Sequence, residues 1–367
     1  MTPMSDASNA VRVQGQVRIV GTGLLGASIG LALTARGVDV ILADSSPSSV
    51  HLASDLGAGR EARDGDNPTL IVVCVPPDVT AEVIERELTD YPHAVVTDVA
   101  SVKLGPLNQL RARGIDLTHY IGSHPLAGRE RGGAISARAD LFLGRPWVVC
   151  RDEETPAADL AIVENLVLEL GAVPIEMEPD EHDDAVGLVS HVPQIISSLL
   201  AKQLVGASDD AVRLAGQGVR DTTRIAASSP ELWIQILGAN AGSVVPVLEN
   251  FQKDLQAMTS ALKDVSAPGA RRVVAEELTA GNMGVERLPG KHGQKRSYAQ
   301  IVVLIDDRPG QLAQLLTELG ELNINLEDLR LEHAEGAQMG LVEFSVLPET
   351  VQKLTTELEA RNWRVAK

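Results

Sequence analysis

The stretch VRIVGTGLLGASIG, residues 17–30, decides the fold of the first part of the chain. It opens with a β-branched run and continues with Gly21, Gly23 and Gly26 at G-x-G-x-x-G spacing, before apolar residues at helical spacing. A strand, a glycine turn and a helix in this order are typical of a dinucleotide-binding unit. The first glycine permits the tight turn, the second lets the backbone approach a pyrophosphate, and the third lets the helix pack on the strand. The alternative is a structural turn without a ligand.

Residues around this turn indicate which dinucleotide binds. Leu24 and Leu25 begin the helix, whose N-terminus offers N–H groups to phosphates. Asp44 ends the next strand, where a carboxylate accepts both ribose hydroxyls and repels a 2′-phosphate. No lysine or arginine follows before Arg60, so the sequence predicts NAD rather than NADP as the cofactor. Pro76 ends a later strand, where it either walls the nicotinamide side of the cleft or merely ends the strand.

Composition excludes several function classes. The 367 residues are 44% hydrophobic but only 2% aromatic, so the cores are expected to be aliphatic. The formal net charge of −18 argues against nucleic acid or a membrane surface as a partner. Cys74 and Cys150 each end an apolar run and are expected to be buried thiols, without a disulfide framework or metal-ligand spacing. No apolar run reaches 18 residues, and we expect a soluble, cytoplasmic protein.

The chain divides by pattern into an α/β part, a helical part and a smaller C-terminal part. Short β-branched runs alternate with helices up to about residue 155, which predicts a Rossmann-type parallel sheet. Long apolar helices then follow, and a helical dimerisation domain explains them better than a monomer does. The last part has the order βαββαβ, which is ferredoxin-like. The predicted segments are a disordered N-terminus (1–15), the nucleotide-binding domain (16–155), the helical substrate and dimerisation domain (156–282), a linker (283–297) and the C-terminal domain (298–367).

A histidine in the stretch YIGSHPLAGRE, residues 120–130, is a candidate for proton transfer. His124 follows a strand of the nucleotide-binding domain, and the pKa of an imidazole lies near neutrality, as oxidation of a hydroxyl carbon requires. Ser101 closes another strand and could hydrogen-bond the ring and fix its tautomer. Taken alone, a loop histidine before proline is more often structural than catalytic.

A second histidine lies in a helix of the central part. His191 and Gln194 are one turn apart in SHVPQ, with Pro193 between them. A proline inside a helix removes a backbone hydrogen bond and bends the helix, so these side chains could line a cleft. A kinked core helix with a satisfied histidine is an equally good interpretation.

Arginines supply candidates for binding an anionic substrate. GVRDTTRIAASSPELW contains Arg220, Arg224 and Trp233, and Arg129 and Arg131 flank the His124 motif. A dicarboxylate needs bidentate guanidinium partners, and such a cluster stands out in an acidic chain. Surface salt bridges are the alternative for all four arginines.

Taken together, these motifs resemble one family, the TyrA-type prephenate dehydrogenases with a C-terminal ACT domain. The resemblance runs in order through VRIVGTGLLGASIGLAL, VASVK, GSHPLAGRE, LVSHVPQ and RDTTRIAASSPELW. It covers the chain apart from its first residues. The ACT resemblance covers roughly residues 299–367 and rests on DDRPGQLAQLLTELGELNIN.

The resemblance implies a role for each candidate. His124 would accept the proton from the ring hydroxyl, and Ser101 would orient it or touch the hydroxyl and the nicotinamide. Arg224 would hold a substrate carboxylate. His191 would make a second polar contact, and Trp233 would form a wall of the site. Glu130 would be an acid that gates or organises the site, and Gln194 would belong to the substrate-binding residues. Arg129 stands where other members often have threonine, so no role is carried over to it.

The implied reaction is the NAD-dependent oxidative decarboxylation of prephenate to 4-hydroxyphenylpyruvate, in a homodimer. An ACT domain implies regulation by an amino acid, and pathway logic makes tyrosine the expected effector, with Gly310 and Asn325 as candidate contacts. A purely structural dimerisation module is the alternative for this domain.

Two other functions compete with this interpretation. Arogenate dehydrogenase has the same fold and chemistry, but its substrate carries an amino group that an acidic side chain would recognise. Gln194 is neutral, which favours prephenate. A non-catalytic amino-acid sensor is an alternative of a different class, against which the intact glycines, Asp44, His124 and Arg224 argue.

Overall fold

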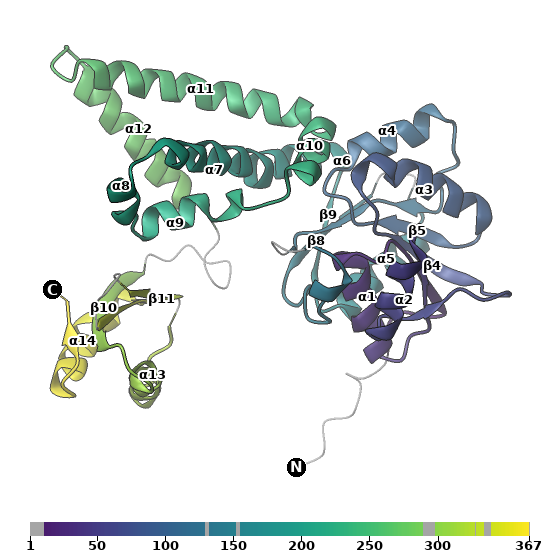
Figure 1. Ribbon diagram of the computed structural model, residues 1–367, viewed down its shortest axis with the longest axis horizontal. Coiled ribbons are helices and arrows are strands. Elements are labelled where there is room, and N and C mark those ends of the chain that lie inside the picture. The colour runs from purple at the N-terminus through teal and green to yellow at the C-terminus, as the bar shows by residue number, and fades with distance from the viewer. Residues whose placement is uncertain are drawn as a thin grey trace. The chain divides into compact units, whose positions relative to one another are not determined.

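The computed structural model describes residues 11–128, 132–151, 155–288, 298–326, 328–333 and 339–366. Contacts within the chain divide it into two units, which meet between Gln252 and Lys253 and are described separately below. Figure 1 labels their helices and strands.

A six-stranded parallel sheet forms the base of the first unit. Its spatial order is β3-β2-β1-β4-β5-β6, the doubly wound order, which confirms the predicted Rossmann-type sheet. The strands are β1 (Gln16–Val20), β2 (Val40–Ala43), β3 (Arg60–Glu61), β4 (Pro68–Val73), β5 (Val95–Asp98) and β6 (Tyr120–Ile121). The connecting helices are α1 (Leu24–Ala35), α2 (Pro47–Asp55), α3 (Pro77–Asp90) and α4 (Leu104–Ala112). The strand order reverses between β1 and β4, so a ligand crevice is expected at their carboxyl ends.

A second, three-stranded sheet carries His124. It consists of β7 (Ser123–Pro125), β8 (Pro146–Cys150) and β9 (Val173–Met177), with β8 between the other two. β7 runs antiparallel to β8 and pairs His124 with Val148. The sequence analysis placed His124 in a loop after a strand of the main sheet. The structure instead places it within this short strand of a separate sheet, because the chain leaves the main sheet at Gly122.

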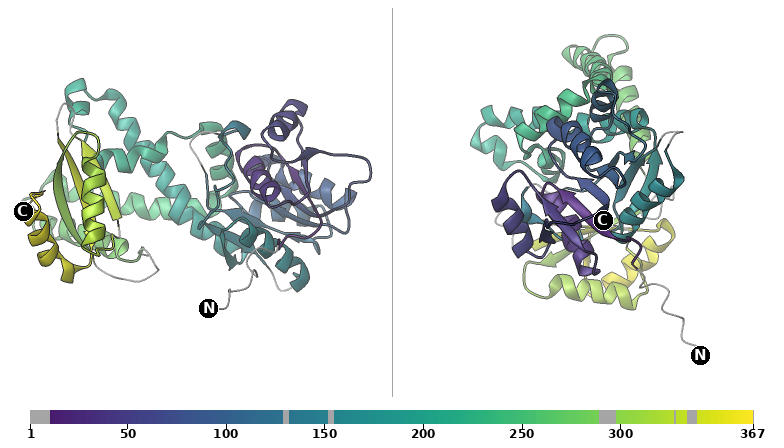
Figure 2. Two further views of the ribbon diagram at one scale, coloured as in Figure 1. Left: turned by 90° about the horizontal axis from the view of Figure 1, so that it is seen from below. Right: turned by 90° about the vertical axis from the view of Figure 1, so that its right-hand side faces the viewer.

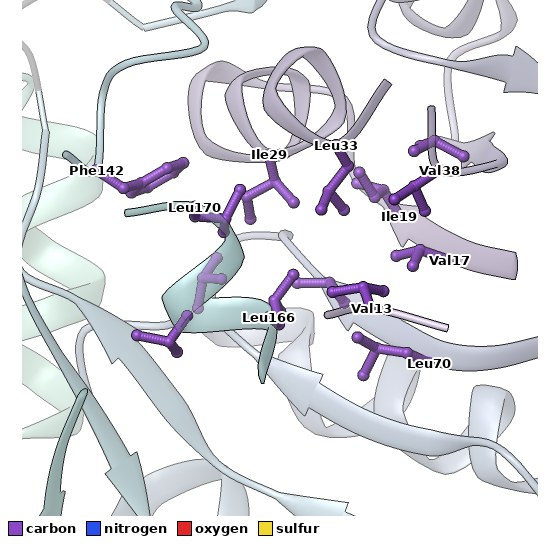
Figure 3. Close-up of a cluster of buried hydrophobic side chains, with 14 of the residues drawn as sticks. Val13, Val17, Ile19, Ile29, Leu33, Val38, Leu70, Phe142, Leu166 and Leu170 are labelled. Atoms are coloured by element: carbon purple, nitrogen blue, oxygen red, sulfur yellow. The ribbon is translucent and has the colours of Figure 1, made fainter. Parts of the chain in front are cut away.

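The nucleotide-binding domain extends beyond residue 155, where the sequence analysis ended it. Helix α5 (Ala157–Glu169) contributes Leu166, and the turn that follows it contributes Leu170, to the same buried cluster as Ile29 of α1 (Figure 3). The next strand, β9, pairs in parallel with β8. Because α5 and β9 complete this core, we place the boundary after Met177. The composition of α5 resembles that of the later helices, so the sequence pattern did not separate them.

The N-terminal residues that the structure describes are packed rather than disordered. Val13 is 6% exposed and belongs to the aliphatic core of the first unit. The backbone N–H of Arg12 donates to the carboxylate of Glu169 at 2.5 Å. The prediction of a disordered segment over 1–15 was therefore wrong for residues 11–15. The segment is mostly polar, so its composition did not predict that Val13 would be buried. Residues 1–10 lie outside the described residues.

Helices build the remainder of the first unit. The break predicted at Pro193 takes the form of a π-helical turn, η2 (Gly187–His191), between α6 (Pro179–Val186) and α7 (Val192–Gln203), with Pro193 in the first turn of α7. Proline lacks an N–H, so the helix can change its hydrogen-bond pattern there. The following elements are α8 (Asp209–Arg213), α9 (Gln217–Thr223), η4 (Arg224–Ala226), α10 (Pro230–Ala239) and α11 (Ala241–Lys263), whose last residues enter the second unit.

These helices expose many large apolar side chains. Val205 and Leu214 are 87% and 86% exposed, and Ile234 of α10 is 72% exposed. Exposed apolar side chains in such numbers are typical of an interaction site. Their position on the helical part matches the predicted dimerisation domain.

One helical stretch of the described residues is long and apolar enough to cross a membrane by length and composition alone. It is Pro179–Gly206, with 28 residues and a mean hydropathy of 1.2, and the bent pair Pro230–Ala239 and Ala241–Lys263 passes the test together. The first stretch buries the polar side chains of His182, Asp183 and His191 within the protein. Of the apolar window tested, 33% is buried inside this chain.

The second unit contains α12 (Ala270–Val285) and a four-stranded antiparallel sheet. The sheet order β11-β12-β10-β13 and the chain order confirm the predicted βαββαβ fold. The sheet and its two helices form the C-terminal part of the chain (Figure 2, yellow-green to yellow). Leu315 and Leu354 of the helices pack with strand residues such as Val303 in one hydrophobic core. The elements are β10 (Ala299–Asp306), α13 (Gln311–Glu321), β11 (Asp328–His333), β12 (Met339–Val346), α14 (Val351–Ala360) and β13 (Arg364–Val365). Helix α12 continues to Val285, three residues into the predicted linker.

Candidate functional site

The three glycines of the turn differ in how much space surrounds them. Gly21 has a φ of +99°, and a Cβ there would lie 2.4 Å from the carbonyl oxygen of Cys74. A Cβ on Gly26 would lie 1.9 Å from the carbonyl oxygen of Gly21. In contrast, nothing lies within 4 Å of a Cβ on Gly23. The first and third glycines therefore allow close packing, and the second leaves open the surface that a pyrophosphate would approach, as the sequence predicts.

Asp44 follows β2 directly and is tied to the glycine turn. One carboxylate oxygen accepts hydrogen bonds from the backbone N–H of Thr22 at 2.8 Å and its hydroxyl at 3.0 Å. The other oxygen accepts from the N–H of Ser46 at 2.9 Å. These bonds hold the carboxylate at the carboxyl end of β2, where it can also accept from ribose hydroxyls. Pro76 immediately precedes α3 on the neighbouring connection, and Leu24 and Leu25 form the first turn of α1. These residues fit a bound NAD.

Ser123 fixes the strand that carries His124. Its hydroxyl donates to the carbonyl oxygen of Asp98 at 2.7 Å and accepts from the indole N–H of Trp147 at 3.0 Å. The hydroxyl of Thr97 donates to the hydroxyl oxygen of Ser123 at 3.0 Å. All these groups are buried, so β7 is held between the end of β5 and β8. The position of the His124 backbone is therefore determined by packing rather than by a loop.

A buried ion pair lies directly behind this strand. The ammonium group of Lys103, whose residue is 2% exposed, contacts the carboxylate of Asp98 and donates to the carbonyl oxygen of Ser123 at 2.7 Å. The hydroxyl of Tyr120 donates to the other Asp98 oxygen at 2.7 Å, and burial together with Asp98 raises the pKa of that phenol well above its ordinary value. A buried pair is tolerated only when its remaining hydrogen-bonding groups are satisfied, as they are here. The sequence analysis missed both charged residues, although TDVASVK places them five residues apart.

The ring of His124 contacts another histidine. Its Nδ1 lies 2.9 Å from Nε2 of His182, and Nδ1 of His182 lies 2.8 Å from a carboxylate oxygen of Asp183. Burial, followed by the charges of His182 and Lys103, lowers the pKa of His124 well below its ordinary value of 6.5.

Ser101 was expected to hold this ring, but within the described residues it makes no hydrogen bond to His124. It lies in the turn between β5 and α4 and is partly exposed. The sequence analysis missed His182 and Asp183, and the only signal for them was the polar run EHDD at the start of a helix that later buries both residues.

His191 lies in the π-helical turn and is linked to the same group. Its Nδ1 lies 3.0 Å from the side-chain nitrogen of Asn240, which donates to the carbonyl oxygen of Asp183 at 2.8 Å. The ring of Trp233 meets His191 edge to face, with a centroid distance of 5.9 Å. Burial lowers the pKa of His191 to about 4. The structure therefore brings His191 and Trp233 together, as the sequence analysis expected of one site.

Gln194 and the arginines lie on neighbouring elements. Gln194 is buried, and its side-chain oxygen accepts from the hydroxyl of Ser228 at 3.4 Å. Helix α7 packs on both α9 and η4. Arg220 lies on α9 and Arg224 begins η4, and both side chains are exposed. Arg129, Glu130 and Arg131 lie outside the described residues.

The structure does not bring Gly310 and Asn325 together within one chain. Gly310 has a φ of +91° and precedes α13, just beyond the end of β10 where Asp306 pairs with Met339. Asn325 precedes β11, whose first residue, Asp328, pairs with Ser345, the partner of Gln300 near the start of β10. The two candidates therefore lie at opposite ends of the sheet.

Comparisons with known proteins agree with this arrangement. Residues 29–176 match the family "Prephenate dehydrogenase, nucleotide-binding domain", and residues 178–276 match "Prephenate dehydrogenase, dimerization domain". The change from one match to the other falls beside the end of β9. The chain is 35% identical to "Probable prephenate dehydrogenase NovF" of Streptomyces niveus, over 94% of this chain and 98% of that protein.

Two solved structures each cover about three quarters of this chain. Prephenate dehydrogenase from A. aeolicus in complex with hydroxyphenyl propionate and NAD+ is 26% identical, covers 74% of this chain and 98% of its own, and gives a TM-score of 0.65. Arogenate dehydrogenase from Synechocystis is 27% identical, covers 74% and 99%, and gives a TM-score of 0.60.

Proposed function

The chain belongs to the prephenate dehydrogenase family, and on that premise we propose that its site oxidises and decarboxylates prephenate to 4-hydroxyphenylpyruvate with NAD. The protein is an NAD-dependent oxidoreductase with a nucleotide-binding domain and a dimerisation domain. The observation that carries the substrate assignment is the buried group in which His124 of β7 meets His182 and Asp183 of α6, at the start of the dimerisation domain.

The cofactor site is formed by the turn that the sequence identified. Gly21, Gly23 and Gly26 would carry the pyrophosphate, together with the N–H groups of Leu24 and Leu25. Asp44 would accept from the ribose hydroxyls, and Pro76 would line the nicotinamide side. NAD supplies the hydride acceptor when it is bound.

His124 would take the proton from the ring hydroxyl of prephenate. Its lowered pKa keeps the ring neutral and able to accept a proton in the pH range of a working enzyme. Ser101, on the adjacent turn, would contact the same hydroxyl. As the carbonyl forms, the carboxylate on the opposite ring carbon leaves as carbon dioxide and the ring becomes aromatic. The protein then mainly has to position groups and stabilise charge.

The substrate carboxylates need cationic and polar partners. Arg224 would bind one carboxylate, and His191 would make a second polar contact against the wall formed by Trp233. Gln194 would lie near the side chain that distinguishes prephenate from arogenate, and Glu130 would gate or organise the site. The neutral amide of Gln194 supports prephenate, because the amino group of arogenate would favour an acid.

The test is a rate comparison by NADH formation. Purified enzyme is given prephenate or arogenate, each with NAD and with NADP, alongside His124→Asn as the inactive control. We expect the prephenate–NAD pair to give the highest kcat/KM, and the variant to lose about 10²- to 10⁴-fold in kcat. A preference for arogenate would replace the substrate assignment. Binding of NAD without turnover of either substrate would favour the amino-acid sensor.

The C-terminal βαββαβ unit is proposed to be an ACT domain that binds tyrosine. Its fold and its turn at Gly310 support this assignment. Because Gly310 and Asn325 lie at opposite ends of one sheet, a tyrosine that contacts both would bind between two subunits of a homodimer. Inhibition by tyrosine should weaken in Asn325→Ala but not in Gln352→Ala, a substitution of an exposed residue on α14. Equal inhibition of both variants and the wild type would leave Asn325 outside the effector site. A cytoplasmic location stays a prediction.

A further inference from the structure

Two hydrogen-bonded side chains lie behind the proposed base, His124. His124 contacts His182 at 2.9 Å, with the rings edge to face at a centroid distance of 5.1 Å and an interplanar angle of 79°. His182 contacts Asp183 at 2.8 Å. His182 is 0% exposed and Asp183 is 1% exposed. Neither residue is needed to bind the substrate or the cofactor in the function proposed above.

The acceptor at the far end of this series sets the direction of its hydrogen bonds. The backbone N–H of Lys103 donates to Oδ1 of Asp183 at 2.8 Å, and that of Leu104 donates to Oδ2 at 2.9 Å. A backbone N–H can only donate, so both oxygens already act as acceptors. Oδ1 is also the atom that faces Nδ1 of His182, and an ionised carboxylate has no proton to give. Nδ1 of His182 is therefore the donor.

The same rule then applies to the next ring. An imidazole that carries a single proton has it on one nitrogen only, so with Nδ1 as its donor the Nε2 of such a His182 ring is an acceptor. The hydrogen at Nδ1 of His124 must donate to it, which leaves the lone pair of His124 on Nε2. From this geometry we propose that His182 and Asp183 are positioning residues that fix the tautomer of His124, with Nε2 as its proton-accepting atom. The proposal rests on the role of His124 as the base.

The arrangement also provides a hydrogen-bond partner for the protonated form that catalysis produces. When Nε2 of His124 takes a proton, the ring becomes a cation and its Nδ1–H becomes a stronger donor to His182. The carboxylate of Asp183 lies one ring further away and balances this charge across His182. This differs from a direct histidine–carboxylate pair, because the acid is separated from the base by a second imidazole.

The kinetic test compares two substitutions of His182 with a matched control. His182→Ala should lower kcat by about 100-fold and change KM by less than about twofold, because only the orientation of the base is lost. His182→Gln should recover much of this loss, because its amide can accept from His124 and donate to Asp183. His119→Gln, which removes another histidine–aspartate pair (2.7 Å to Asp159) in the same unit, should leave kcat unchanged.

A double-mutant cycle separates positioning from general destabilisation. In a His124→Asn background, His182→Ala should change the residual kcat by less than about twofold, because residues that act as a unit are not additive. The proposal would be overturned if His182→Ala lowered kcat by the same factor in both backgrounds. A rise in KM without a decrease in kcat would also overturn it. If His182→Ala does not fold, the cycle is built with His182→Gln alone. We then expect a smaller decrease in kcat in the wild-type background and no decrease in the His124→Asn background.

A second readout does not depend on turnover. In protein labelled with ¹⁵N-histidine, nitrogen shifts report which ring nitrogen carries the proton. We expect the Nδ1–H tautomer for both His124 and His182 in the wild type, and mixed tautomers of His124 in His182→Ala. A wild-type His124 with its proton on Nε2 would overturn the positioning role even if the enzyme oxidises prephenate. Conversely, the expected tautomers with no turnover would count against the proposed function alone.

Discussion

His124 acquires its chemistry from the side chains packed around it. Burial and the neighbouring cationic groups lower the pKa of His124 well below 6.5, so the ring gives up its proton at a lower pH than an exposed histidine does. The acid limb of the pH profile of kcat/KM, which reports the free enzyme, should therefore lie below pH 6.5. Kinetics with saturating NAD across the acid range check this expectation. A limb at or above pH 6.5 would contradict it.

Arg224 offers a separate test of substrate binding. A hydrogen bond to a charged group contributes about 1.5–3 kcal/mol, so Arg224→Gln should raise KM for prephenate by about 10- to 100-fold. The effect on kcat should be smaller, because the carboxylate is bound in both the ground state and the transition state. Arg213→Gln serves as the control, since Arg213 is an exposed arginine that pairs with Asp210 on α8. An unchanged KM in Arg224→Gln would remove that residue from the substrate site.

His191 should make folding sensitive to acid. Its pKa is about 4 in the folded protein and 6.5 as an ordinary histidine, so the unfolded chain binds this proton first as the pH falls. The contribution to stability is complete above pH 6.5 and is lost as the pH falls to about 4. The difference corresponds to about 3 kcal/mol. Thermal unfolding of the wild type and His191→Gln at several pH values checks this. Parallel pH dependence of the two proteins would contradict it.

At the scale of elements, the glycine turn separates folding from cofactor binding. A methyl group on Gly26 would strike the carbonyl oxygen of Gly21, whereas one on Gly23 meets no atom within 4 Å. Gly26→Ala should therefore lower the free energy of unfolding by about 1–3 kcal/mol or prevent folding. Gly23→Ala should keep the wild-type Tm but weaken NAD binding by about tenfold, equivalent to about 1.4 kcal/mol. Differential scanning calorimetry and NAD titration distinguish the two variants. Equal loss of Tm in both would contradict this assignment.

The elements also show what the sequence can and cannot predict. The parallel sheet, the break at Pro193 and the βαββαβ order all follow from local periodicity and from residues with restricted backbones, so the sequence predicts them. The second sheet does not follow, because SHP is too short to show a strand pattern. The side chains that contact His124 could not be predicted from the sequence for another reason. His182 is 58 residues away in the chain, and only the packing of α6 against β8 and α4 makes it a neighbour.

At the scale of the whole molecule, the exposed apolar helices predict a dimer that charge can disrupt. Val205→Asp combined with Leu214→Asp places two charges on surfaces that are 87% and 86% exposed in one chain. Burying an unpaired charge in an interface costs several kcal/mol, so the doubly substituted protein should be monomeric. Light scattering with size-exclusion chromatography measures the mass. Leu56→Asp, on the nucleotide-binding domain, is the control and should stay dimeric. A dimeric double variant would place the interface elsewhere.

The separation of Gly310 and Asn325 has a consequence for how the enzyme would sense its end product. Under the proposed regulation, a tyrosine that contacts both residues would be held only where two chains meet, so its binding would require a pair of subunits. Sensitivity to tyrosine would then decline on dilution, as pairs of C-terminal domains come apart, while the chemistry in the first unit continues. A cell that makes little of this protein would restrain it weakly, and a cell that makes much would restrain it strongly. Feedback of this kind depends on the abundance of the enzyme as well as on the concentration of its effector.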